Sequence, residues 1–117
     1  MNKLKNKDCL DKTIEKICDD FNVSSIDLIS RRRVKELSIA RWLIFNLLKT
    51  NSILSLVEIG NKYDKDHTSV IHGIREIQKR EPKLISKYQS VYEDCKGFVF
   101  KNLNCNRESS IMIFVFY

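Results

Sequence analysis

Two amphipathic patterns joined by a short polar turn limit the fold of this chain most strongly. Ser55 can cap a first helix, and Glu58 can return a hydrogen bond to the amide of Ser55, which is the capping-box pattern. Asp66 can cap a second helix. Apolar residues follow each cap at helical spacing, namely Leu56, Ile59 and Tyr63 and then Val70, Ile71, Ile74 and Ile77. The sequence therefore predicts a helix-turn-helix over about residues 55–79.

The segment from residue 35 to about residue 50 is apolar nearly all round. Ile39, Trp42 and Phe45 add apolar side chains to faces that the helical period would otherwise leave polar. Such a helix is normally the buried centre of a small domain. Further helices are predicted over about residues 12–21, from Ser24 to Ile29, and over about residues 83–100 after Pro82.

A single all-α domain follows from these elements. The chain of 117 residues is long enough for one compact domain, and it contains only three glycines, one proline and no convincing strand pair. We expect the helical domain at residues 11–101, a flexible N-terminus at residues 1–10 and an irregular tail at residues 102–117. The tail ends in an apolar run, residues 111–117, for which no partner strand is evident.

Charge and motifs favour a binding protein over an enzyme. A net charge of +6 and a pI near 9.2 favour a polyanionic partner, although many soluble proteins are mildly basic. The chain contains no Gly-rich phosphate loop, no nucleophile elbow and no His-Glu-x-x-His pattern. His67 and His72 are spaced too far along a helix to share a face as metal ligands. We expect no catalysis, no ATP or other small-molecule substrate, no cofactor and no metal.

The cysteines and the apolar runs predict a reduced, cytoplasmic protein, and association with the nucleoid is expected only from the DNA-binding candidates described next. No Cys-x-x-Cys pair occurs, and Cys18 and Cys95 lie at apolar helical positions, where a free cysteine behaves as a small hydrophobic residue. No signal peptide is evident, and residues 111–117 are far fewer than the roughly 20 needed to span a bilayer. Secretion and membrane insertion are both disfavoured.

The first turn of the second helix carries candidate DNA-binding side chains. Thr68 and Ser69 could bond a base edge in the major groove, and His67 could donate to a base or a phosphate. Asp66 could combine capping with acceptance of a bond from cytosine. Without other support, an ordinary polar helix start explains these four residues equally well.

Cations on other segments could contact the DNA backbone. The run of arginines at residues 31–33 lies between two predicted helices, and an arginine on such an arm can enter a narrow minor groove. A charge run is usually a solvated surface, but Arg41 shortly afterwards strengthens the functional interpretation. Lys49, Lys65 and Arg75 could add phosphate contacts.

A family resemblance rests on the run Asp-His-Thr-Ser-Val-Ile-His at residues 66–72, preceded by Glu-Ile-Gly at residues 58–60. These residues resemble the signature of domain IV, the C-terminal DNA-binding domain of the bacterial replication initiator DnaA. The similarity covers about residues 11–79 and includes the Ser-Arg-Arg-Arg run at residues 30–33. It implies a Trp-repressor-like helical fold that binds double-stranded DNA at a DnaA box, with a major-groove helix and a minor-groove arginine.

Positions of the family pattern map onto this chain. The resemblance places Arg33 in the minor groove and makes Arg41 a backbone contact; basic Lys49 also matches the family. It implies DNA contacts near the start of the second helix for Lys65, Asp66, His67, Thr68 and Ser69. Three departures are Asp64 in place of paired glycines, Trp42 in place of a common glutamine, and Ser69 in place of a threonine.

The resemblance leaves several functions open. The ATPase module of DnaA is missing from this chain, because no Walker motif occurs in it. Small versions of the domain resemble replication regulators, competitors for initiator sites or mobile-element proteins. An alternative is an adaptor that has lost DNA binding and contacts a replication initiator through its last helix or residues 111–117. RNA binding is less favoured, because no exposed aromatic platform is evident.

Overall fold

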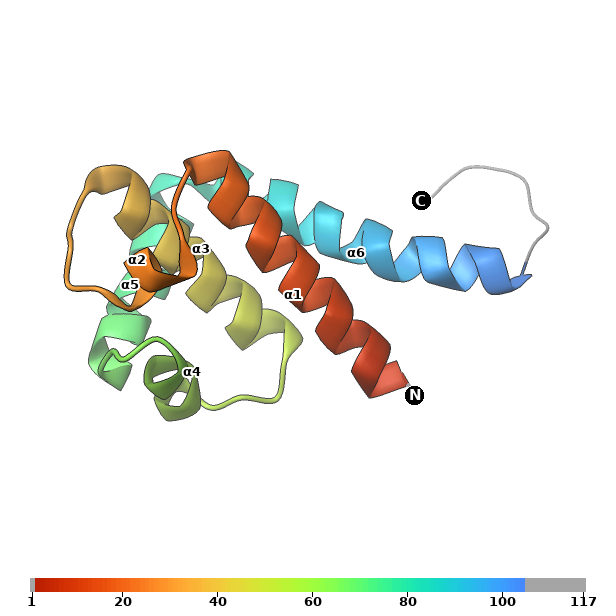
Figure 1. Ribbon diagram of the computed structural model, residues 1–117, viewed down its shortest axis with the longest axis horizontal. Coiled ribbons are helices and arrows are strands. Elements are labelled where there is room, and N and C mark those ends of the chain that lie inside the picture. The colour runs from red at the N-terminus through yellow and green to blue at the C-terminus, as the bar shows by residue number, and fades with distance from the viewer. Residues whose placement is uncertain (1, 105–117) are drawn as a thin grey trace.

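The computed structural model describes residues 2–104, which form six helices and no strand (Figure 1). This arrangement confirms the predicted all-α class. The helices in chain order are α1 (Asn2–Phe21), α2 (Ser25–Ile29), α3 (Lys35–Asn51), α4 (Leu56–Lys62), α5 (His67–Arg80) and α6 (Pro82–Asn104).

Helix α3 is the centre of the domain, as its apolar sequence predicts. It contacts each of the other five helices. Its buried apolar side chains are Leu37, Ala40, Leu43, Ile44, Phe45, Leu47 and Leu48. The buried polar side chain of Asn46 is bonded as well, because its Oδ1 atom accepts from Nε2 of Gln78 on α5 at 3.2 Å. Burial on several faces explains why this segment lacks the polar stripe of a surface helix.

Helices α4 and α5 form the predicted helix-turn-helix, and both predicted caps are present. The Ser55 amide donates to Oε1 of Glu58 at 2.8 Å, and the Glu58 amide donates to Oγ of Ser55 at 3.1 Å. Asp66 accepts from the Thr68 amide at 3.2 Å and thereby caps α5. Ile59 of α4 and Val70 of α5 are fully buried, so both helices face the core.

The turn between α4 and α5 depends on two special backbone positions. The amide of Lys65 donates to the carbonyl of Gly60 at 2.7 Å, so the turn folds back tightly onto α4. A Cβ atom on Gly60 would overlap the carbonyl oxygen of Lys65. Asp64 has a φ of 56°, in the left-handed region that aspartate tolerates better than most residues. The family resemblance described above would instead place glycines in this turn.

The N-terminal boundary predicted from the sequence is wrong. Residues 1–10 were expected to be flexible, but α1 begins at Asn2. Cys9 and Leu10 are buried and extend the apolar face that includes Ile17. The helix therefore gains core contacts before the first periodic residue that the sequence pattern identified.

The C-terminal boundary also differs from the prediction. Helix α6 continues to Asn104, beyond the expected end at about residue 100, and Figure 1 shows it extending past the other helices. Part of the predicted irregular tail at residues 102–117 is therefore helical. The apolar run at residues 111–117 lies outside the described residues.

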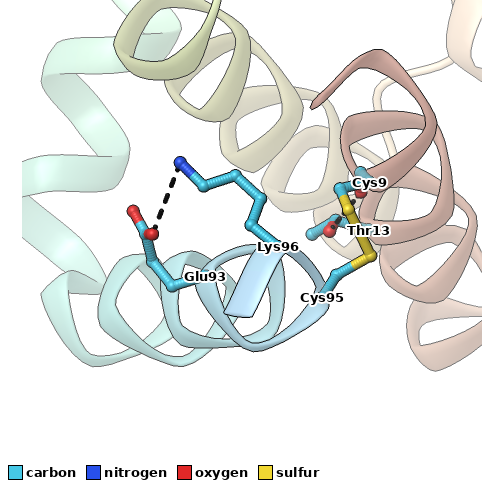
Figure 2. The surroundings of a disulfide bond; sticks show 5 residues. All are labelled: Cys9, Thr13, Glu93, Cys95 and Lys96. Atoms are coloured by element: carbon cyan, nitrogen blue, oxygen red, sulfur yellow. Dashed lines mark hydrogen bonds and ion pairs between the residues drawn. A yellow bond between two sulfur atoms is a disulfide. The ribbon is translucent and has the colours of Figure 1, made fainter. Parts of the chain in front are cut away.

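A disulfide between Cys9 of α1 and Cys95 of α6 corrects the expectation of free cysteines in a reduced protein (Figure 2). The Cα atoms of the pair are 5.7 Å apart, within the usual range for a disulfide. Oγ1 of Thr13 donates to the carbonyl of Cys9 at 2.7 Å, one turn away on α1. Cys18 is free and half-buried, and burial raises the pKa of its thiol. The pairing joins residues 86 positions apart, which no local sequence pattern could predict.

Between residues 2 and 104, no helix is long and apolar enough to cross a membrane.

Candidate nucleic-acid interface

A groove of about 700 Å³ lies between the linker that joins α2 to α3, the helix α3 and the start of α5. We call residues 30–34 the arginine linker. The groove is lined by Ser30, Arg31, Arg33, Ser38, Arg41, Trp42, Phe45, Asp64, Lys65, Asp66, Thr68, Ser69 and His72. The cationic linker and the first turn of α5 therefore open onto one surface.

The first turn of α5 presents a charged and hydrogen-bonding edge. Oγ1 of Thr68 donates to the carboxylate of Asp66. This bond is the main reason that the pKa of Asp66 is lowered, and the bond from the Thr68 amide is the second. The carboxylate therefore stays ionised at neutral pH and can accept hydrogen bonds. Ser69 is exposed beside it, and Nδ1 of the exposed His67 lies 3.6 Å from Oδ1 of Asp66. These polar atoms are available to a ligand at the helix start.

The arginine linker presents its charges to solvent. Arg31, Arg32 and Arg33 are all exposed. Arg32 is paired with Asp27 of α2, with Nη1 3.6 Å from Oδ1. Arg31 and Arg33 instead line the groove. Arg33 therefore has the exposure that a minor-groove contact requires.

Arg41 and Lys65 have acceptors within the protein. Arg41 is only 7% exposed, and its guanidinium donates to carbonyl oxygens of α2 and the arginine linker. Nζ of Lys65 donates to the carbonyls of Ile29 and Ser30, at 2.9 and 2.8 Å. The pKa of Arg41 is lowered mainly by burial and secondly by repulsion from Arg33. The pKa of Lys65 is lowered mainly by burial and secondly by repulsion from Arg41.

The groove includes some of the predicted site residues and leaves others outside. Six of the eight line it, namely Arg33, Arg41, Lys65, Asp66, Thr68 and Ser69. His67 is next to the groove at the start of α5, and Lys49 is exposed in the last turn of α3 without lining it. Lys49 is thus separate from the other candidates.

His72 and Trp42 line the groove, although neither is among the site residues predicted from the sequence. His72 is exposed, and its ring meets the edge of Trp42 at a centroid distance of 6.0 Å. Its position four residues after Thr68 and three after Ser69 could have revealed the shared helix face. Trp42 lies on the helix that was predicted to be the buried centre of the domain, but its side chain is only half-buried. It packs closely against Gly73 and lies beneath the guanidinium of Arg80.

Comparisons with known proteins agree with this geometry. The family model described as "Bacterial dnaA protein helix-turn-helix" matches residues 10–77. The chain is 39% identical over 74 residues to the chromosomal replication initiator protein DnaA of Oleidesulfovibrio alaskensis, covering 63% of this chain and 16% of that protein. It is 31% identical over 87 residues to DnaA of Caldanaerobacter subterraneus subsp. tengcongensis, covering 72% of this chain and 20% of that protein.

The chain thus spans only a small fraction of the length of these relatives. Residues 10–77, which the family model matches, include the arginine linker, α4 and most of α5. The matched range agrees closely with the resemblance, which covers about residues 11–79 and has its signature at residues 58–72. The described helices agree with the helical fold that the resemblance implies. The chain belongs to the family of the bacterial DnaA helix-turn-helix, a DNA-binding domain.

Proposed function

We propose that this protein binds double-stranded DNA sequence-specifically at a site similar to the DnaA box, and that it acts in replication initiation or its regulation. The main support for this proposal is the groove, because the first turn of α5 and the arginine linker both line it. A helix start and a cationic arm in this relation can enter a major groove and the adjacent minor groove together. Membership of the DnaA helix-turn-helix family supports the same ligand.

The first turn of α5 is assigned the reading of bases in the major groove. The hydroxyl of Thr68 donates to Asp66, which leaves its methyl group and an oxygen lone pair to meet a base edge. Ser69 has an exposed hydroxyl, and His67 has an exposed imidazole that can donate to a base or a phosphate. Asp66 keeps the helix start fixed as its cap and can accept from a cytosine amino group.

Two cations outside α5 are assigned different tasks. Arg33 is exposed on the arginine linker and enters the minor groove, where a narrow groove concentrates negative potential. Lys49 is exposed at the end of α3 and contacts a phosphate, which adds affinity without sequence information. Specificity and general affinity therefore reside in different side chains.

Three alanine variants test this division. Arg33→Ala and Thr68→Ala should each cost about 1–3 kcal/mol on the preferred duplex and little on a random duplex. Lys49→Ala should weaken binding to both duplexes alike. It should also make the negative slope of log affinity against log salt shallower by about 0.9, because one phosphate contact is lost. The measurement is fluorescence anisotropy over a salt series. Equal losses on both duplexes for all three variants would contradict the assignment.

A further inference from the structure

We propose that Arg41 and Lys65 are positioning residues, which hold the arginine linker in a fixed position relative to the start of α5. This inference rests on the proposed function, because this relative position matters only if the linker and α5 contact the same DNA. It assigns both cations a role different from the phosphate contacts that the sequence predicted. The argument depends on their acceptors, their burial and their charged neighbours.

The guanidinium of Arg41 joins α3 to both ends of the turn that leaves α2. Its Nε atom donates to the Leu28 carbonyl at 2.9 Å, and Nη1 donates to the Arg32 carbonyl at 2.6 Å. Its Nη2 atom donates to the Asp27 carbonyl at 2.8 Å and also to the Ser30 carbonyl. A planar group with donors on all three nitrogens can satisfy these separate acceptors at once, whereas a lysine ammonium cannot span them.

Lys65 ties the same turn to the helix-turn-helix. Its ammonium donates to the carbonyl of Ile29 and to that of Ser30. The Ser30 carbonyl therefore accepts from both Arg41 and Lys65, one from α3 and one from the turn before α5. Because Lys65 directly precedes the α5 cap, Asp66, the linker is joined to the start of α5 through one side chain.

The chemistry of the acceptors explains why cations occupy these positions. The last carbonyls of a helix lack partners within it and attract positive charge, and α2 ends at Ile29. Arg33 and Arg41 repel each other, and the Asp27 carboxylate is paired with Arg32. Hydrogen bonds to the backbone therefore hold a cationic segment against its own repulsion. They also occupy donors that a phosphate contact by Arg41 would need.

We call the hydrogen bonds from Arg41 and Lys65 to the backbone carbonyls of residues 27–32 the clamp. Limited trypsin digestion of the DNA-free protein tests whether the clamp holds the arginine linker. Arg41→Lys keeps the charge but loses most of the hydrogen bonds, so cleavage after residues 31–33 should become roughly tenfold faster as the linker opens locally. Arg75→Lys, an exposed arginine on α5, is the matched control and should leave the cleavage rate unchanged. Cleavage in Arg41→Lys at the wild-type rate would overturn the clamp.

Binding measurements on a DnaA-box duplex and a scrambled duplex test the positioning role. Arg41→Lys should lose roughly tenfold or more on the box duplex, little on the scrambled duplex, and almost nothing further when combined with Arg33→Ala. A phosphate anchor predicts instead that lysine largely preserves binding to both duplexes. Retained binding, an equal loss on both duplexes, or a loss that adds fully to that of Arg33→Ala would overturn the proposal.

A second variant guards against misfolding of Arg41→Lys, whose side chain is buried. Lys65 is less buried, and Lys65→Met should weaken box binding more than scrambled binding and should also expose the linker to trypsin. Equal losses on the two duplexes would overturn its positioning role. A wild-type protein with no preference between duplexes would contradict the proposed function, while the digestion would still decide whether the clamp exists.

Discussion

At the scale of single residues, the turn of the helix-turn-helix depends on backbone geometry. Gly60 allows the Lys65 backbone to approach α4 closely, and Asp64 adopts a φ of 56°, in the left-handed region. Because Lys65 also donates to the arginine linker, the shape of this turn determines where the clamp begins. A small change in this turn therefore affects both the stability of the domain and its proposed DNA surface.

Replacement of Gly60 with alanine should destabilise the protein. The new Cβ atom would overlap a backbone oxygen, which cannot rotate away, so the free energy of unfolding should fall by about 1–3 kcal/mol. Urea denaturation followed by circular dichroism measures the change. Gly97→Ala is the matched control, because a Cβ there meets nothing within 4 Å and alanine favours helix by about 0.5–1 kcal/mol. Equal effects of the two substitutions would contradict this explanation.

At the scale of elements, local signals predicted the middle of the chain better than its ends. The capping boxes at Ser24 and Ser55 and the aspartate cap of α5 are all formed within a few residues, so the sequence contains them in full. The start of α1 and the end of α6 were placed wrongly. Cys9 and Leu10 are buried by tertiary packing, and a periodicity count that began near Lys12 could not detect it.

Helices α1 and α6 are also joined by a hydrogen bond that should make stability depend on acid pH. The hydroxyl of Tyr88 donates to Oδ2 of Asp20 at 2.6 Å, and this bond is the main reason that the pKa of Asp20 is lowered. A carboxyl whose pKa is lower in the folded state stabilises the fold above its unfolded pKa of about 3.9. That contribution is lost as the pH falls through the folded-state pKa.

Tyr88→Phe should therefore reduce the loss of stability between about pH 5 and pH 2, because the pKa of Asp20 would return toward its unfolded value. Urea denaturation at a series of pH values measures this slope. Tyr92→Phe is a suitable control, since Tyr92 is equally buried on the same helix but makes no such bond to a carboxylate among the described residues. Identical pH slopes in wild type and Tyr88→Phe would contradict the role of this bond.

At the scale of the whole molecule, the Cys9–Cys95 disulfide closes most of the described chain into one loop, because its two cysteines are 86 positions apart in the sequence. The residues that line the groove come from α3, α5 and the turns beside them, and none comes from α1 or α6. The disulfide should therefore affect the stability of the fold much more than the proposed contacts with DNA.

Reduction, or the substitution Cys9→Ser, should lower the free energy of unfolding by about 4.6 kcal/mol, the chain-entropy value for a loop of this length. Urea denaturation with and without a reductant measures the difference, and DNA affinity under native conditions should be unchanged. Cys18→Ser is the control, because Cys18 is not in the disulfide. Equal stability of the oxidised and reduced proteins would contradict a stabilising role.

The contacts that bring the arginine linker and α5 together in the groove could not be predicted from the sequence alone. Residue types and helix position suggested Thr68 and Ser69 as base contacts, but only the family resemblance assigned Arg33 to the minor groove. The bonds from Arg41 and Lys65 to Ser30 connect segments distant in sequence, and their acceptors are carbonyl groups present in every residue. A sequence pattern cannot distinguish such a cation from one that contacts phosphate.

Sequence-specific DNA binding is tested most directly by comparing wild-type affinity for a DnaA-box duplex and for a scrambled duplex by fluorescence anisotropy at two salt concentrations. Sequence-specific binding through α5 and the arginine linker predicts a preference of roughly tenfold or more for the box, and affinity for both duplexes should fall steeply with salt. Equal affinity for the two duplexes at both salt concentrations would contradict it.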